Sequence, residues 1–119
     1  MPQSTGEFFN RHLQMFATGD VEGMMTNFTD ETFVLTPMGT IKGLDALRGF
    51  FTQVCKEFAD PATVYTLNKK EVEGDVVYTT WSADTPANTY HFGSDTFLIR
   101  DEKVVAQTFA AYITPKTAT

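Results

Sequence analysis

Hydrophobic residues recur every three or four positions in the first half of the chain, the spacing of a helix with one buried face. Residues 5–18 predict an amphipathic helix, because Phe9, Leu13 and Phe16 share one side of it. A second short helix is predicted after Asp20, whose side chain can cap its first turn. The longest helical pattern covers residues 44–58, with apolar residues at Leu44, Leu47, Phe50, Phe51, Val54, Cys55 and Phe58.

Strand patterns fill the rest of the chain. Phe33–Pro37 predicts a short strand, and Thr40–Lys42 predicts its return after a turn. Beyond Pro61, β-branched and aromatic residues alternate with polar ones, which favours a curved antiparallel meander of four strands. The expected strands cover residues 63–73, 76–84 and 88–114, with Asp101–Glu102 dividing the last run and Lys116–Thr119 left as a tail.

The predicted sheet carries apolar groups on both faces. In the run that ends at Arg100, Phe97 and Ile99 point one way, and a second set points the other way. Three helices can cover only one of these faces, and a large exposed apolar face is rare on a monomer. We therefore expect a homodimer through the sheet face. The second set is Tyr90, Phe92 and Leu98.

Composition narrows the class of protein. The 119 residues suit one domain, 1–119, and the net charge of −6 without a basic stripe disfavours nucleic acid and anionic membranes as partners, leaving neutral or cationic ones. No apolar run of roughly 18 residues or leader segment stands out, so no membrane span is expected. A single cysteine, Cys55, on the apolar side of a predicted helix excludes an intramolecular disulfide and fits a reduced, cytoplasmic protein.

Four short motifs, in this order and spacing, carry a resemblance to a known superfamily: Phe16–Asp20, Gly43–Phe51, Ser94–Phe97 and Lys103–Gln107. With the order of the predicted elements, the chain resembles the nuclear transport factor 2-like (NTF2-like) superfamily, which includes ketosteroid isomerase and the SnoaL-like polyketide cyclases. The resemblance implies an α+β cone, in which three N-terminal helices pack on a curved antiparallel sheet and enclose a mainly apolar pocket. This fold hosts isomerases, dehydratases, cyclases, epoxide hydrolases and binding modules, so it implies no single activity.

Two ionisable residues are directed toward the expected interior. Asp95 lies in a mostly uncharged strand, and His12 lies beside the apolar stripe of the first helix. By resemblance to ketosteroid isomerase, Asp95 takes the position of the acid beside the oxyanion, and His12 that of a tyrosine. Thr36 takes the position of the general base, but a threonine hydroxyl cannot accept a proton near neutral pH. We expect His12 and Asp95 to form a hydrogen-bonded acid/base pair, with Asp95 raising the basicity of the imidazole.

Further residues could line the pocket. Trp81 and Tyr78 lie on opposite faces of one strand, so only one of them can do so. Gln107 is placed inward by the resemblance, whereas His91, on the face of Asp95 by alternation, is expected near the mouth or in solvent. No cluster with metal-ligand spacing and no phosphate-binding loop occurs, so no metal or cofactor is expected. The expected ligand-contacting residues are Thr36, Trp81, Tyr78, Gln107, Phe16, Tyr112 and His91.

Two classes of function remain open. The first is a cofactor-free isomerase, cyclase or dehydratase that acts on a small apolar molecule with His12 and Asp95. The second is a non-catalytic dimeric module that binds a ligand or a protein, with the same pair buried and mutually satisfied. The volume of the cavity is the first property that separates them. A closed pocket much smaller than about 300 Å³ favours a scaffold or interaction role, whereas an open one with room for a ring favours ligand chemistry.

Overall fold

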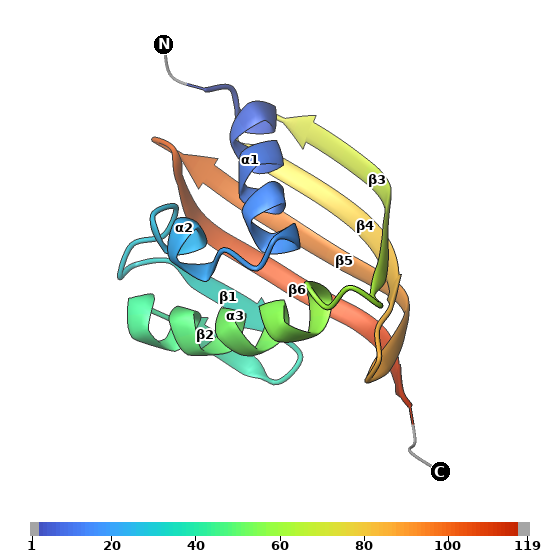
Figure 1. Cartoon of the computed structure of the whole chain (residues 1–119). Helices are drawn as coiled ribbons and strands as arrows, with labels where there is room; N and C mark the ends of the chain where they lie inside the picture. Colours follow the sequence, from blue (N-terminus) through green and yellow to red (C-terminus); the bar gives the residue numbers. More distant parts are fainter. Residues whose placement is uncertain (1–2, 117–119) are drawn as a thin grey trace.

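The structure is a computed structural model that describes residues 3–116. These residues form three helices and one sheet of six strands. All three helices lie against one face of the sheet (Figure 1). The helices are α1 (Thr5–Ala17), α2 (Val21–Met25) and α3 (Leu44–Phe58). The strands are β1 (Phe33–Thr36), β2 (Gly39–Lys42), β3 (Val64–Glu73), β4 (Val76–Asp84), β5 (Asn88–Arg100) and β6 (Lys103–Pro115).

Helix α1 begins with a reciprocal cap. The Ser4 hydroxyl accepts a hydrogen bond from the Glu7 amide at 3.2 Å, and the Ser4 amide donates to the Glu7 carboxylate at 2.9 Å. These bonds satisfy amides that have no partner within the helix. From this start the helix directs Phe8, Phe9 and His12 into the interior, which confirms that His12 faces the core.

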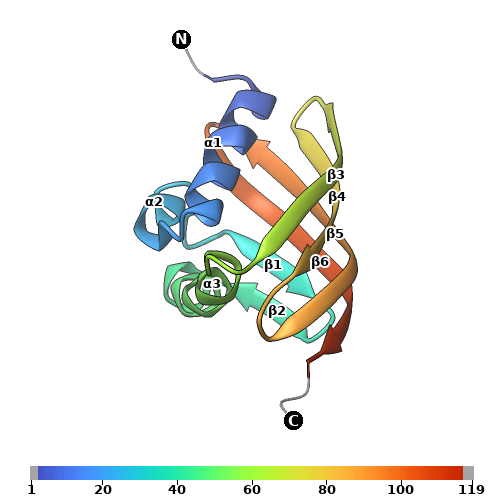
Figure 2. The same cartoon turned by 45° about the vertical axis from the view of Figure 1, so that its right-hand side comes forward.

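The strands run in the order β2-β1-β6-β5-β4-β3. Strand β1 pairs parallel with β6, and every other pairing in the described sheet is antiparallel. The sheet curves around the helices, as the turned view in Figure 2 shows, and its concave face holds the interior. Register shifts interrupt β3–β4, β4–β5 and β5–β6, and such bulges bend the strands that contain them. The expected α+β cone is confirmed.

One bulge corrects the predicted faces of β5. The register of β5 against β6 shifts between Tyr90 and Phe92. Tyr90 is buried beside Trp81, whereas Phe92 is 51% exposed, although alternation alone expects Tyr90 and Phe92 on the same face. The extra residue also moves His91 to the opposite face from Asp95. A period-two pattern cannot locate such a bulge.

The last described strand is fastened at its end. The Lys116 amide donates to the Ala87 carbonyl at 2.8 Å, and the Lys116 ammonium lies 2.8 Å from an Asp84 carboxylate oxygen. Of the expected tail, residues 117–119 lie outside the described part. None of the helices within residues 3–116 combines the length and hydropathy needed to cross a bilayer.

Candidate active site

The helices and the concave face of the sheet enclose a cavity of about 200 Å³. Most of its wall is aromatic or aliphatic, with contributions from all three helices and from strands β3 to β6. An apolar cavity of about 150 Å³ is large enough for benzene, so this one has room for a molecule of roughly one ring. The polar residues that reach the wall, apart from two tyrosines, are His12, Glu57, Thr79, Asp95 and Gln107.

Asp95 is the carboxyl group at the centre of this wall. Trp81 Nε1 donates to one of its oxygens at 3.2 Å, and Gln107 Nε2 donates to the other at 3.2 Å. The three residues come from the inward positions of β4, β5 and β6, so the sheet itself fixes their arrangement. Burial raises the pKa of Asp95 from 3.8 to about 7, and the two hydrogen bonds oppose part of that rise. Asp95 can therefore exchange a proton near neutral pH.

His12 lies in the wall on the helical side. Its Nδ1 accepts a hydrogen bond from Asn27 Nδ2 at 2.9 Å, so the neutral ring carries its proton on Nε2. Phe8, Phe28 and Phe97 surround the ring, with centroids 5.4 to 6.3 Å away. Burial, and to a smaller extent the charge of Arg11, lowers the pKa of His12 from 6.5 to about 4. The imidazole is therefore neutral and is a poor base.

The expected hydrogen bond between His12 and Asp95 is absent from the described residues, although both side chains line the cavity. Asn27 bonds His12, and Trp81 and Gln107 bond Asp95. The pKa of His12 is lowered rather than raised, because burial acts on it without a carboxylate partner to offset the cost. Sequence reasoning missed Asn27, whose only visible signal was its place at the end of a short Met-rich helix.

The structure separates the other predicted residues into two groups. Phe16, Trp81 and Gln107 lie in the wall of the cavity. The residues that lie away from it are Thr36, Tyr78, Tyr112 and His91.

Each residue outside the wall has another environment. The Thr36 hydroxyl donates to the Gly39 carbonyl and accepts from the Met38 amide, so it holds the β1–β2 turn. Tyr78 is 38% exposed on the convex face of the sheet. His91 and Tyr112 are exposed, and their rings pack against each other at an interplanar angle of 38° with centroids 4.6 Å apart.

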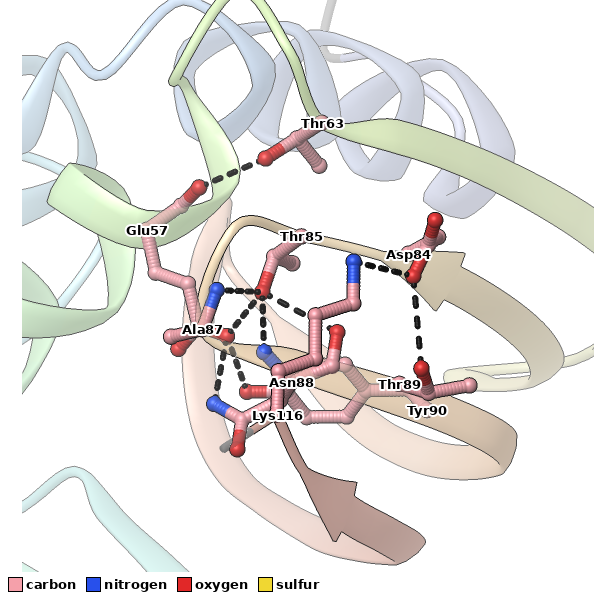
Figure 3. Close-up of polar contacts among 9 residues, drawn as sticks. All are labelled: Glu57, Thr63, Asp84, Thr85, Ala87, Asn88, Thr89, Tyr90 and Lys116. Atoms are coloured by element: carbon pink, nitrogen blue, oxygen red, sulfur yellow. Dashed lines mark hydrogen bonds and ion pairs between the residues drawn. The ribbon is translucent and has the colours of Figure 1, made fainter. Parts of the chain in front are cut away.

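Glu57 is a site residue that the sequence analysis overlooked. It lies on α3 three residues after Val54, so it shares the inward stripe of that helix. A carboxylate on an apolar stripe is the same signal that marked Asp95. Figure 3 shows Glu57 beside the β4–β5 connection, with the side chains of Thr85, Asn88 and Tyr90 bonded to its carboxylate.

A shallow groove runs outside the cavity, between the end of α1 and the connection from α3 to β3. Four residues line both the groove and the cavity and so form the partition between them. These residues are Leu13, Phe16, Phe58 and Tyr65. Within residues 3–116, no three His, Cys, Asp or Glu side chains converge as they would around a metal ion.

Solved structures with this fold come from several kinds of protein. The epoxide hydrolase/cyclase-like enzyme SalBIII, described for pyran ring formation in the polyether salinomycin, matches with a TM-score of 0.78 and 14% identity, over 94% of this chain and 95% of its own. A candidate ketosteroid isomerase from Kribbella flavida DSM 17836 matches with a TM-score of 0.76 and 11% identity, over 97% and 82%. An NTF2-like protein of unknown function from Cytophaga hutchinsonii ATCC 33406 matches with a TM-score of 0.73 and 13% identity, over 96% and 93%.

At these identities the matches establish the fold and no particular activity. A comparison with curated proteins found no match. The model of the SnoaL-like domain matches residues 9–107, which include every polar group of the cavity wall described above. The chain therefore belongs to the SnoaL-like domain family.

Proposed function

We propose that the protein is a cofactor-free acid/base enzyme of the isomerase, cyclase or lyase type, acting on a small and mainly apolar molecule in the cavity. The observation that carries this proposal is Asp95, a carboxyl group in an apolar wall held by two donors. A carboxyl group with a pKa near 7 is half protonated at neutral pH and can act as acid or base.

His12 has a supporting role in this proposal. A neutral imidazole with its proton on Nε2 is a hydrogen-bond donor, and Nε2 has no protein partner among the described residues. It can therefore donate to an oxygen of the substrate on which negative charge develops. The assignment replaces the expected His–Asp pair with two groups that act separately on a carbonyl or hydroxyl compound.

Exchange of α-protons for deuterium tests the proposal directly. The wild-type protein is expected to accelerate this exchange in one-ring ketones such as cyclohexanone, followed by proton NMR in D₂O. Asp95→Asn should reduce the acceleration by roughly 10²- to 10⁴-fold, the contribution typical of one positioned proton-transfer group. Asp45→Asn, at a fully exposed position on α3, is the matched control and should leave the rate unchanged.

Exchange no faster than in buffer would contradict the catalytic proposal. If such ketones nevertheless quench the fluorescence of Trp81, the only tryptophan, the protein is a binding module. Two features favour this second function. Thr36 supplies no base, and the imidazole of His12 is already bonded to Asn27.

We also propose that two copies associate through the convex face of the sheet. From the row of Val76, Leu98 and Ala106 to the row of Phe92 and Tyr112, the outward positions of β4, β5 and β6 carry no Asp, Glu, Lys or Arg. Asp84 and Arg100 lie beyond these rows, at the two ends of the strands. Among them, Tyr78, Phe92 and Tyr112 are 38%, 51% and 67% exposed. A continuous uncharged surface of this kind is typical of an interface between identical subunits.

A charge introduced on this face should prevent the association. Thr108 is exposed on the convex side of β6, so Thr108→Lys is expected to convert the dimer to a monomer in sedimentation velocity at micromolar concentration. Gln53→Lys, on the exposed side of α3, is the matched control and should remain dimeric. A wild-type protein that sediments as a monomer would contradict the proposal.

A further inference from the structure

The cavity has an unbalanced set of charges. Glu57 and Asp95 both reach its wall, whereas no Lys or Arg side chain does so among the described residues. A ligand with a carboxylate or phosphate would therefore be repelled and would have no cationic partner. A neutral or positively charged ligand meets no such barrier, which agrees with the net charge of −6 of the whole chain.

The carboxylate of Glu57 is held in place by one of its oxygens. Thr85 Oγ1, Asn88 Nδ2 and the Tyr90 hydroxyl donate to Oε2 at 2.6, 2.8 and 2.8 Å. Burial, and next the hydrogen bond to Glu57, raises the pKa of Tyr90, so its hydroxyl stays protonated and remains a donor. Three bonds from two elements fix the position of this carboxylate before any ligand arrives (Figure 3).

The second oxygen of Glu57 is available to a ligand. All three structural bonds end on Oε2, and Oε1 has no hydrogen-bond partner among the described residues. No Lys, Arg or His in residues 3–116 forms an ion pair with this carboxylate. Fastening the β4–β5 connection needs one oxygen, so it does not explain a charged group that also faces the cavity.

A layer of aromatic rings extends from Tyr90, which bonds this carboxylate, toward Asp95. Phe58, the next residue along α3, packs on Tyr90 and Trp81 with centroids 5.0 and 5.7 Å apart, and Trp81 also lies 5.7 Å from Tyr65. The faces of such rings attract cations, most strongly where water is excluded. Tyr90 binds Glu57 at one end of this layer, and Trp81 binds Asp95 at the other.

Beside Asp95, the side chain of Gln107 also has an oxygen that no donor in residues 3–116 reaches. Gln107 Oε1 is buried without a hydrogen-bond partner, while its Nε2 is used by Asp95. Gln107 is 6% exposed and lies in the cavity wall. The oxygens of Glu57 and Gln107 that have no hydrogen-bond partner among the described residues are thus both acceptors. An unused donor of the cavity wall, His12 Nε2, lies on the helical side.

We propose that the ligand of the cavity is a small protonated amine, whose ammonium group binds Glu57 Oε1 beside Phe58 and Tyr90 and whose apolar body lies over Trp81 toward Asp95. The inference rests on the proposed function in one respect, namely that the cavity binds a small and mainly apolar molecule. Glu57 then determines specificity, and Asp95 performs the chemistry. A cavity of about 200 Å³ limits the body to about one ring.

Three compounds with the same phenyl body separate the possible ligand classes: 2-phenylethylamine, 2-phenylethanol and phenylacetate. Their binding can be followed by the fluorescence of Trp81, excited where these compounds do not absorb. The amine is expected to bind the wild-type protein at least about tenfold more tightly than the alcohol, because it adds a desolvated ion pair and cation–π contacts. Phenylacetate should not bind at accessible concentrations.

Two isosteric variants test the assignment to Glu57. Glu57→Gln keeps an acceptor oxygen for the three structural donors and removes the charge, so the amine should bind no better than the alcohol. Unchanged binding of 2-phenylethanol by the same variant shows that the cavity is intact. Asp45→Asn, which removes a fully exposed carboxylate from the same helix, is the control and should keep the preference for the amine.

The other outcomes overturn the inference. An alcohol that binds the wild-type protein as tightly as the amine, or measurable binding of phenylacetate, contradicts the amine class and leaves the proposed acid/base function standing. A preference for the amine that is kept in Glu57→Gln contradicts the role of Glu57. Binding of none of the three compounds contradicts both the inference and the ligand-binding role beneath it. The wild-type comparison decides the ligand class even if Glu57→Gln does not fold.

Discussion

Replacing Asp95 with asparagine is expected to raise the free energy of unfolding by about 4 kcal/mol at pH 8 and to change it little at pH 4. Burial raises the pKa of Asp95 from 3.8 to about 7. The folded protein therefore holds this proton more tightly than the unfolded chain does. The wild-type protein loses stability as the pH rises from 3.8 through 7, and an asparagine, which has no proton to lose, avoids the loss.

His12 makes the test sharper, because its contribution has the opposite sign. Burial lowers its pKa from 6.5 to about 4, so the stability it contributes is present above pH 6.5 and is lost as the pH falls toward 4. This loss is about 3 kcal/mol. In the wild-type protein the contributions of Asp95 and His12 largely cancel between pH 4 and 6.5. In Asp95→Asn only that of His12 remains, so this variant should lose stability on acidification.

Urea unfolding from pH 4 to pH 8, at one fixed protein concentration, measures both effects. Asp45→Asn is the control, because Asp45 is fully exposed and its replacement should leave the pH dependence unchanged. An Asp95→Asn variant that is no more stable than the wild type at pH 8, or equally stabilised at both ends of the range, would show that Asp95 is not buried as described.

The second large effect is expected at Gly93. A methyl group there would lie 2.2 Å from Trp81 Cε2, far inside van der Waals contact. Gly93→Ala should therefore displace the indole and lower the free energy of unfolding by about 3 kcal/mol, the upper part of the range for overpacked cores. Because the same indole donates to Asp95, the variant should also lose the acceleration of proton exchange.

Gly49→Ala is the matched control for this substitution. Gly49 lies in α3, and nothing would come within 4 Å of an added methyl group. Alanine should stabilise the helix there by about 0.5 to 1 kcal/mol. Urea unfolding followed by Trp81 emission compares the two variants. If both glycines tolerate alanine equally, the close packing of Trp81 on the β5 backbone is wrong.

Periodicity in the sequence was sufficient to locate most of the elements. Predicted runs 44–58 and 76–84 coincide with α3 and β4. Helical spacing succeeds because each helix buries a single face, so the position of every apolar residue is constrained by the same interior. The antiparallel hairpin of β1 and β2 was predicted, because its turn is local. The parallel pairing of β1 with β6 was beyond this reasoning, because strand order depends on contacts between distant segments.

The faces of the strands were predictable only between bulges. His91 was expected on the face of Asp95, and one extra residue in β5 reverses it. Bulges follow from the curvature of the whole sheet, which no local pattern records. The polar site was predictable in part for a different reason. A lone carboxylate among apolar neighbours marked Asp95, and the same rule applied to helices would have found Glu57.

The partition formed by Leu13, Phe16, Phe58 and Tyr65 has a consequence for the rate at which a ligand enters and leaves the cavity. Each of these side chains touches the hollow on one side and the outer groove on the other, so the barrier is a single layer thick. Rotation of a phenyl ring is far faster than the displacement of a packed helix. A ligand can then enter and leave by side-chain rotation while the backbone keeps its shape. Asp95 and its two donors, Trp81 and Gln107, therefore stay in place between one ligand and the next.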